Sequence, residues 1–206
     1  MNSLKHSAML SILLLLTGCA SFEAKTELLK GRMALLDGMP DAAIVHFQQA
    51  TALDGEVKYS SLQEGAWTYL GRAHYDAKQY PQARQALERA LAINSDDGLA
   101  RLYLGLTLAR EGNHASGRKE VLGGLQSLNE TLNYIVYNTQ SGPYWDPGGK
   151  IRNELRAAQA EAAAANPILD KLFSRLESIG VSVEQEIDLA RRDESFDLRH
   201  NSGSDM

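Results

Sequence analysis

Apolar residues recur through the middle of the chain at spacings of three and four positions. Ala83, Leu87 and Ala90 are the clearest case, because an i, i+4, i+7 spacing places three side chains on one face of a helix. Pro40 and Pro81 precede two such stretches, in positions that suit the first turn of a helix, where a missing N–H is harmless. These patterns predict an all-α chain of short amphipathic helices.

Three segments of the chain align with one another. They cover residues 38–50, 79–94 and 112–124, and each follows a predicted helix that contains a glycine. Leu104-Gly105 falls 34 residues after Leu70-Gly71, so two of the units share a fixed period. A helix pair that cannot bury its apolar face alone must stack on a neighbour. We therefore expect stacked helix pairs, with close helix packing at the first-helix glycines, which are Gly31, Gly71 and Gly105.

The second unit resembles the tetratricopeptide repeat (TPR), through Trp67-x-x-Leu70-Gly71 followed by Ala83, Leu87 and Ala90. The resemblance covers residues 24–130 and implies an all-α fold: a short TPR superhelix of about three helix pairs with a helical C-terminal cap. The alternative is an unrelated helical bundle with accidental spacing. The sequence departs from the TPR pattern at Tyr75, which is displaced, and at Ser95, where proline is expected.

The chain is expected to divide into four parts: a signal peptide over residues 1–18, a TPR solenoid over 19–131, a C-terminal helical region over 132–194 and a flexible tail over 195–206. In the C-terminal region, helices are predicted over 150–165 and 167–179. Gly180 would end the second of these, and Ser182-Val183-Glu184-Gln185 reads as a capping box that starts a last helix ending near Arg192.

Within the C-terminal region, the segment Tyr144-Trp145-Asp146-Pro147 before the predicted 150–165 helix allows two interpretations. It could be a binding loop with Trp145 as an aromatic anchor. It could also be a buried plug in which Asp146 caps the following helix, with Pro147 at its first position. The second interpretation is favoured.

The N-terminus carries a secretion signal. Lys5 supplies a positive charge, residues 8–16 are apolar but too few to span a bilayer, and the chain's only cysteine, Cys19, follows at once. Thr17-Gly18-Cys19 resembles the lipobox of bacterial lipoproteins. That resemblance implies cleavage before Cys19, a diacylglyceryl group on its sulfur and acylation of the new amino end. Ala20 after the cysteine favours the outer membrane, with the protein facing the periplasm; the alternative is a chance cysteine in an ordinary signal.

Composition, charge and motifs argue against several classes of function. The 206-residue chain has a net charge of −5, or about −6 once Lys5 leaves with the signal, and no basic patch that would suit nucleic acid. A single cysteine allows no internal disulfide. The histidines are scattered, and no metal-binding or nucleophile motif occurs. We therefore expect no enzyme activity, no cofactor and no metal.

A TPR stack presents a concave face lined by first helices. Arginines on that face could recognise carboxylates, while tyrosine and leucine side chains would supply apolar area. The alternative is that individual arginines bridge neighbouring helices. The predicted partner-binding residues are Arg32, Thr68, Arg72, Tyr75, Leu102, Leu106, Arg110 and Trp145.

These features predict a lipid-anchored TPR adaptor that recruits or assembles protein or peptide partners in the bacterial envelope. It resembles outer-membrane TPR lipoproteins that assist assembly or dock envelope enzymes. The alternative is a small-ligand or glycan-binding module centred on Tyr144 and Trp145.

Overall fold

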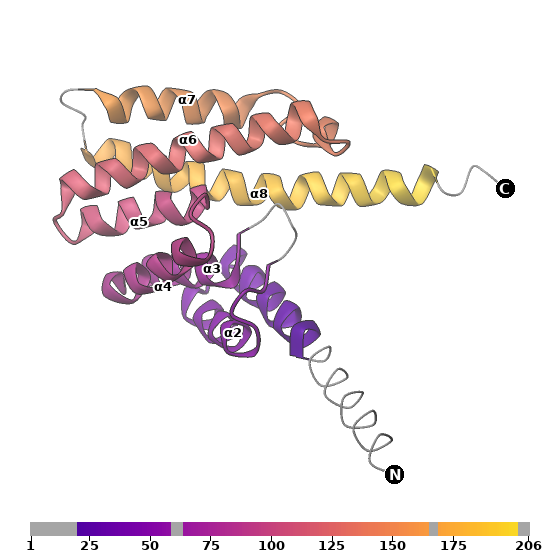
Figure 1. Cartoon of the computed structure of the whole chain (residues 1–206), viewed down its shortest axis with the longest axis horizontal. Helices are drawn as coiled ribbons and strands as arrows, with labels where there is room; N and C mark the ends of the chain where they lie inside the picture. The colour runs from indigo at the N-terminus through magenta and orange to yellow at the C-terminus, as the bar shows by residue number, and fades with distance from the viewer. Residues whose placement is uncertain (1–19, 59–63, 165–168, 202–206) are drawn as a thin grey trace, which may run out of the picture. The chain divides into compact units, whose positions relative to one another are not determined.

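The structure is a computed structural model that describes residues 20–58, 64–164 and 169–201. Its helices confirm the predicted all-α class (Figure 1). Cys19 and the predicted signal peptide lie outside the described residues. The chain divides after Ser95 into two compact units, which are taken in turn.

The described part of the first unit contains two helix pairs. The first pair is the helix of residues 20–36 with α2 (Pro40–Leu53), and the second is α3 (Ala66–Asp76) with α4 (Tyr80–Ile93) (Figure 1). Each second helix carries its proline in the first turn, as the sequence predicts. The pairs stack because α2 also packs against α3.

The core of the first unit forms around two aromatic rings. Phe47 of α2 and Tyr69 of α3 are fully buried and stack with their ring centroids 5.8 Å apart. Gly31 makes room for this pair, since a methyl group at Gly31 would lie only 2.5 Å from the Phe47 ring. The predicted inward stripe of α4 is also confirmed, with Ala83 and Leu87 fully buried.

The second unit starts with α5 (Gly98–Arg110) and α6 (His114–Asn138). A short 3₁₀ turn (Gly142–Tyr144) leads to α7 (Lys150–Ala163) and α8 (Leu169–Asn201). Helix α5 packs on α6, α6 on α7, α7 on α8, and α8 returns to α5, so the contacts close a ring of helices. The third helix pair is therefore part of the same core as the C-terminal helices.

The predicted boundary between residues 131 and 132 does not exist, because α6 runs through it. Its buried stripe continues without a break at spacings of three and four residues. Because apolar side chains continue to be buried along α6, the helix extends past the repeat. The third repeat unit and the C-terminal region therefore share one helix. The stripe comprises Val121, Leu125, Leu128, Leu132 and Ile135.

The predicted end of a helix at Gly180 is wrong, since α8 continues through it. A methyl group at Gly180 would lie 2.7 Å from the Tyr103 hydroxyl, so this glycine allows α5 and α8 to pack closely. The Ser182-Val183-Glu184-Gln185 segment is accordingly mid-helix and caps nothing.

The predicted flexible tail is partly wrong as well, because α8 reaches Asn201. The loop before α7 holds Asp197 of this tail and Glu194 just before it. Ser141 Oγ donates to Glu194 Oε1 at 2.6 Å, and the Tyr144 hydroxyl donates to Asp197 Oδ2 at 2.8 Å. Among the described residues, no helix combines the length and the apolar character needed to cross a membrane.

We expect Gly105→Ala to destabilise the protein. The new methyl group would lie 2.6 Å from the backbone O of Gly117 and N of Val121, which cannot move aside as a side chain would. Overpacking of this kind costs roughly 1–3 kcal/mol, more than alanine gains in helix propensity. Gly123→Ala in α6 is the matched control, because its methyl group meets the movable end of Arg101, 3.1 Å away. Urea unfolding of both variants checks this; equal stability would contradict the tight α5–α6 contact.

We expect Glu27 to make the stability of the first unit depend on acid pH. Hydrogen bonds from Lys30 Nζ at 2.6 Å and with His46 Nδ1 at 2.7 Å lower the pKa of this carboxyl. A lowered folded-state pKa contributes stability above the unfolded-state pKa and loses it as the pH falls through the folded-state value. Glu27→Gln should therefore melt below the unchanged protein at neutral pH, with the difference shrinking below about pH 4.

Thermal melts across that pH range measure the effect. Glu88→Gln is the control, because the Arg84–Glu88 pair is about half exposed on both sides and such pairs contribute little. A difference between Glu27→Gln and the unchanged protein that stays constant with pH would contradict the expectation.

Candidate functional site

Two of the predicted partner-binding residues of the first unit are packed arginines. Arg32 is 5% exposed, and its guanidinium carbon lies 5.1 Å from the centroid of the Tyr69 ring. Arg72 is similarly buried, with its Nε 3.5 Å from the Asp76 carboxylate one helical turn away. Arg32 thus links the helix of residues 20–36 to α3, which matches the alternative that arginines bridge neighbouring helices.

The side chains of Thr68 and Tyr75 on α3 are buried as well. Thr68 is completely covered, and the Tyr75 ring packs against Tyr80 with centroids 5.7 Å apart. Partner binding through these α3 residues stays a prediction. In the described structure they offer little surface.

The second unit contains the remaining predicted residues. Leu102 and Leu106 are 0% and 1% exposed, so they belong to the core that α5 forms with its neighbours. Arg110 is partly exposed, but its guanidinium donates to Glu177 Oε1 at 2.8 Å on α8. The open apolar wall expected from the two leucines is therefore not present on this helix, because α6 and α8 cover it.

Trp145 is also buried, at 4% exposure, and this confirms the plug interpretation of its loop. The Tyr144 hydroxyl is engaged with Asp197, and this hydrogen bond raises the pKa of Tyr144. A hollow of about 300 Å³ beside the loop is lined by Asp146, Pro147 and Lys150, among others, but by neither aromatic ring. Nothing in this geometry favours a ligand site centred on Tyr144 and Trp145.

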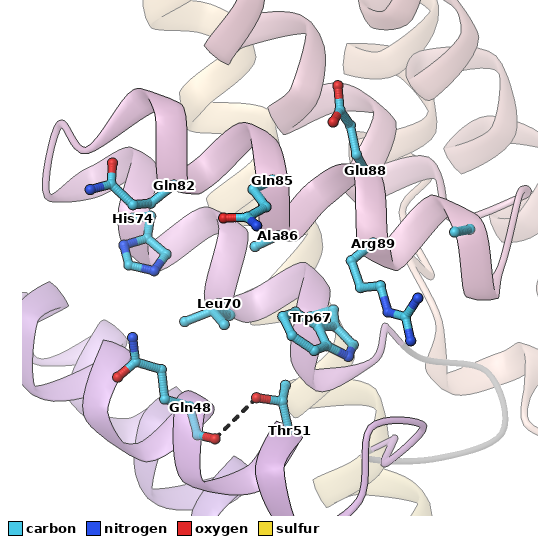
Figure 2. A pocket seen from close by; sticks show the side chains of 11 residues that line it. Gln48, Thr51, Trp67, Leu70, His74, Gln82, Gln85, Ala86, Glu88 and Arg89 are labelled. Carbon is cyan, nitrogen blue, oxygen red and sulfur yellow. Dashed lines mark hydrogen bonds between the residues drawn. The ribbon is translucent and has the colours of Figure 1, made fainter.

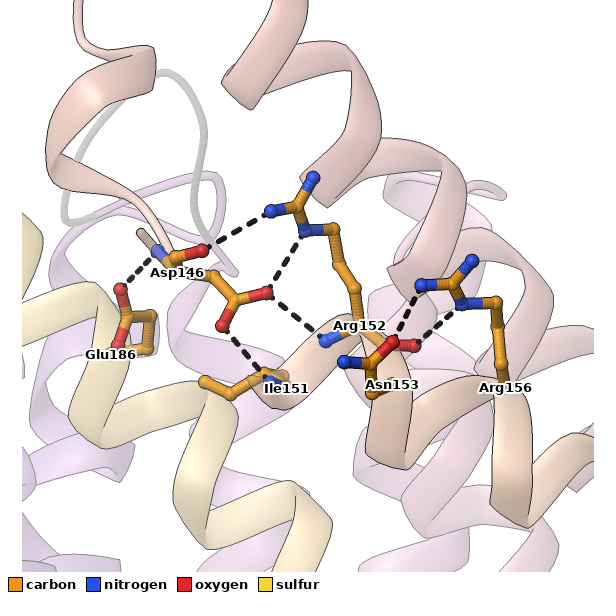
Figure 3. A network of polar contacts seen from close by, with 6 residues as sticks. All are labelled: Asp146, Ile151, Arg152, Asn153, Arg156 and Glu186. Atoms are coloured by element: carbon orange, nitrogen blue, oxygen red, sulfur yellow. Dashed lines mark hydrogen bonds and ion pairs between the residues drawn. The ribbon is translucent and has the colours of Figure 1, made fainter. Parts of the chain in front are cut away.

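Asp146 is the residue that organises this loop (Figure 3). Its carboxylate accepts from the backbone N–H groups of Ile151 and Arg152, and from Arg152 Nε at 2.9 Å. That hydrogen bond raises the pKa of Arg152. The backbone N–H of Asp146 in turn donates to Glu186 of α8. Asp146 therefore caps α7 as predicted, and the helix begins at Lys150, where the predicted range of 150–165 begins. Pro147 lies before the helix and not at its first position.

The first unit contains a groove whose lining includes none of the predicted partner-binding residues (Figure 2). It has a volume of about 630 Å³ and lies between α2 and α4, with α3 as its floor. Trp67 and Leu70 give the floor an apolar surface. The rim is mostly uncharged and polar, and it includes Gln48, Thr51, Gln82 and Gln85.

Local sequence explains how the groove forms. Gly71 lies directly under Leu87, so α3 and α4 approach closely on their packed side. Ala86 is the small α4 residue on the groove side, and it leaves space above Leu70. At one end, His74 Nδ1 lies 2.8 Å from Gln79 Oε1, which fixes the orientation of the imidazole ring.

The groove suits a peptide segment. Side-chain amides both donate and accept hydrogen bonds, so three glutamines can satisfy the backbone groups of a bound chain. The Trp67 and Leu70 floor can take a small apolar side chain. One feature of the sequence could have predicted this groove, namely Trp67, the tryptophan of the repeat. In the structure Trp67 is partly exposed, and the glutamines lie on the outward faces of the second helices.

Within the described ranges, no three His, Cys, Asp or Glu side chains gather in a way that could hold a metal ion.

Comparison with protein families gives a match to the tetratricopeptide repeat over residues 65–97. The match spans the end of the loop before α3, both helices of the second pair and the turn after α4. A comparison with curated proteins gave no match. TPR arrays generally bind other proteins on the surfaces that their stacked helices create. The chain therefore contains a tetratricopeptide repeat, and this repeat forms most of the groove in the first unit.

Proposed function

We propose that this chain is a lipid-anchored TPR adaptor of the bacterial envelope, which recruits or assembles partner proteins. The observation that carries the proposal is the TPR match at residues 65–97, because this repeat type is a protein-interaction module. The role requires no catalytic residues, cofactor or nucleic acid. Its place is the outer membrane, facing the periplasm.

The anchor is assigned to Cys19 from its sequence context. The apolar stretch before it and the small residues Thr17-Gly18 support cleavage and lipid attachment at this cysteine. The first described helix begins at residue 20, so a lipid on Cys19 would hold the repeats beside the membrane without a linker. Stable anchoring takes two or more acyl chains, which the lipobox resemblance implies.

The binding surface is assigned to the α2–α3–α4 groove. This groove is open, whereas the predicted first-helix residues of α3 are buried. Its amide-rich rim and apolar floor fit an uncharged peptide segment of a partner protein. The charged residues that line it are Glu88 and Arg89, which carry opposite charges.

We expect Cys19→Ala to abolish lipid attachment. Cells fed an alkyne fatty acid should label the unchanged protein and leave the variant unlabelled, and the variant should leave the membrane pellet. Ser21→Ala is the control, because it changes a nearby exposed residue and keeps the cysteine. Unchanged membrane partition of Cys19→Ala would contradict the lipid anchor.

We expect partner contacts to concentrate in the groove. A photo-reactive amino acid at Gln85, on the groove rim, should cross-link to discrete envelope proteins. The same amino acid at Gln49, which is exposed on α2 outside the groove, is the matched control. Both side chains are exposed, so neither change should alter the melting temperature. Cross-links of equal yield from both positions would argue against the groove.

A further inference from the structure

The helix of residues 20–36 has two apolar faces. One face packs into the first unit, where Ala24 and Leu28 are fully buried and Leu35 is 8% exposed. The other face consists of large apolar side chains that remain exposed. These are Phe22 at 75%, Leu29 at 40%, Met33 at 64% and Leu36 at 57% exposure.

The exposed side chains form one continuous stripe. They are spaced by seven, four and three residues, and at about 100° per residue they fall within an arc of about 60°. By the same rotation, the buried Ala24, Leu28 and Leu35 are centred about 130° away from the stripe. Lys25 lies at one edge of the stripe, while Lys30 lies farther out on the other side, next to Glu23, and pairs with Glu27.

Such a stripe is unusual at this position. The first helix of a repeat array ordinarily has a polar outer face, because no further repeat covers it. A row of exposed apolar side chains instead marks a contact surface. Apolar residues on one face with lysines at its edges are typical of helices that lie in the membrane interface, where the lysine stems reach along the apolar surface toward the headgroups.

The stripe lies close to Cys19 in the chain. Phe22 is the third residue after Cys19, so the proposed acyl chains would hold the start of this helix at the bilayer surface. Tethering converts a weak surface contact into an intramolecular one at high effective concentration. Lys25, at the edge of the stripe, adds attraction to anionic headgroups.

We propose that the Phe22, Leu29, Met33 and Leu36 face lies in the interfacial layer of the membrane that holds the Cys19 lipid. This inference rests on the proposed lipid anchor. The anchor would then consist of a lipid and an amphipathic helix together. The helix would fix which side of the first unit faces the membrane, which a lipid alone cannot do.

The test uses the one-cysteine sequence. In the lipidated protein the Cys19 sulfur is blocked, so Met33→Cys supplies the single thiol for an environment-sensitive fluorophore. The protein is placed in vesicles of phosphatidylcholine and phosphatidylglycerol, with and without brominated lipid. We expect several-fold stronger quenching by brominated lipid at position 33 than at Gln49→Cys, the exposed control on α2.

Two results would overturn the proposal. Equal and weak quenching at positions 33 and 49 would place the stripe in water. A pyrene label at position 33 that gives excimer emission without lipid quenching would show that a second copy covers the stripe. As a second variant, Leu29→Gln with Met33→Gln changes exposed side chains only, and it should expose a fluorophore at position 36 to water while leaving the melting temperature unchanged.

The lipid anchor is tested separately by thiol labelling of the unchanged protein. Absence of labelling together with incorporation of an alkyne fatty acid shows that Cys19 is blocked by lipid, while full labelling, or no labelling without fatty-acid incorporation, refutes the proposed anchor whatever the stripe does. A blocked Cys19 with an aqueous probe at position 33 would overturn the stripe inference alone.

Discussion

The close contact between the two helices of each pair is the constraint on which the rest of the structure depends. In each pair a glycine of the first helix faces the second helix without room for a methyl group. Gly31 lies against the ring of Phe47, Gly71 against Leu87, and Gly105 against the backbone of α6. These contacts bring the helix axes together and set which side chains the next element must cover. Substitution at one of these glycines would disturb the packing of a whole pair.

The groove of the first unit follows from the same packing. Helices α3 and α4 meet tightly at Gly71, while α2 packs on another side of α3. The space between α2 and α4 therefore has α3 as its floor, and the outward glutamines of both second helices form its rim. Each wall of the groove is held by its own core contacts. A surface that needs little reordering can bind an extended segment at a smaller entropic cost.

The sequence predicted the helix pairs well, because the apolar period and the glycine positions repeat along the chain. The sequence-based predictions were wrong where one residue type is compatible with two structural roles. Glycine is the residue that most often ends a helix, yet Gly180 provides space for Tyr103. These two residues are far apart in the sequence, so no local pattern predicts their contact. Likewise, Leu102 and Leu106 fit a groove wall or a core equally well. Their burial comes from the packing of α5 on α6 and α8, and the path of α8 could not be read from the residues around α5.

The helix of residues 20–36 is a second case in which the sequence did not show which apolar residues are buried. Its sequence places apolar residues on two faces that are separated by polar residues such as Glu23, Lys25 and Lys30, so the sequence alone does not tell which face the fold buries. The structure separates the two faces, since Leu28 is buried in the first unit and Met33 is 64% exposed. Packing within the chain thus accounts for only half of the apolar residues in this helix. The other half is left for a surface outside the described fold, and the proposed lipid on Cys19 would bring the membrane to it.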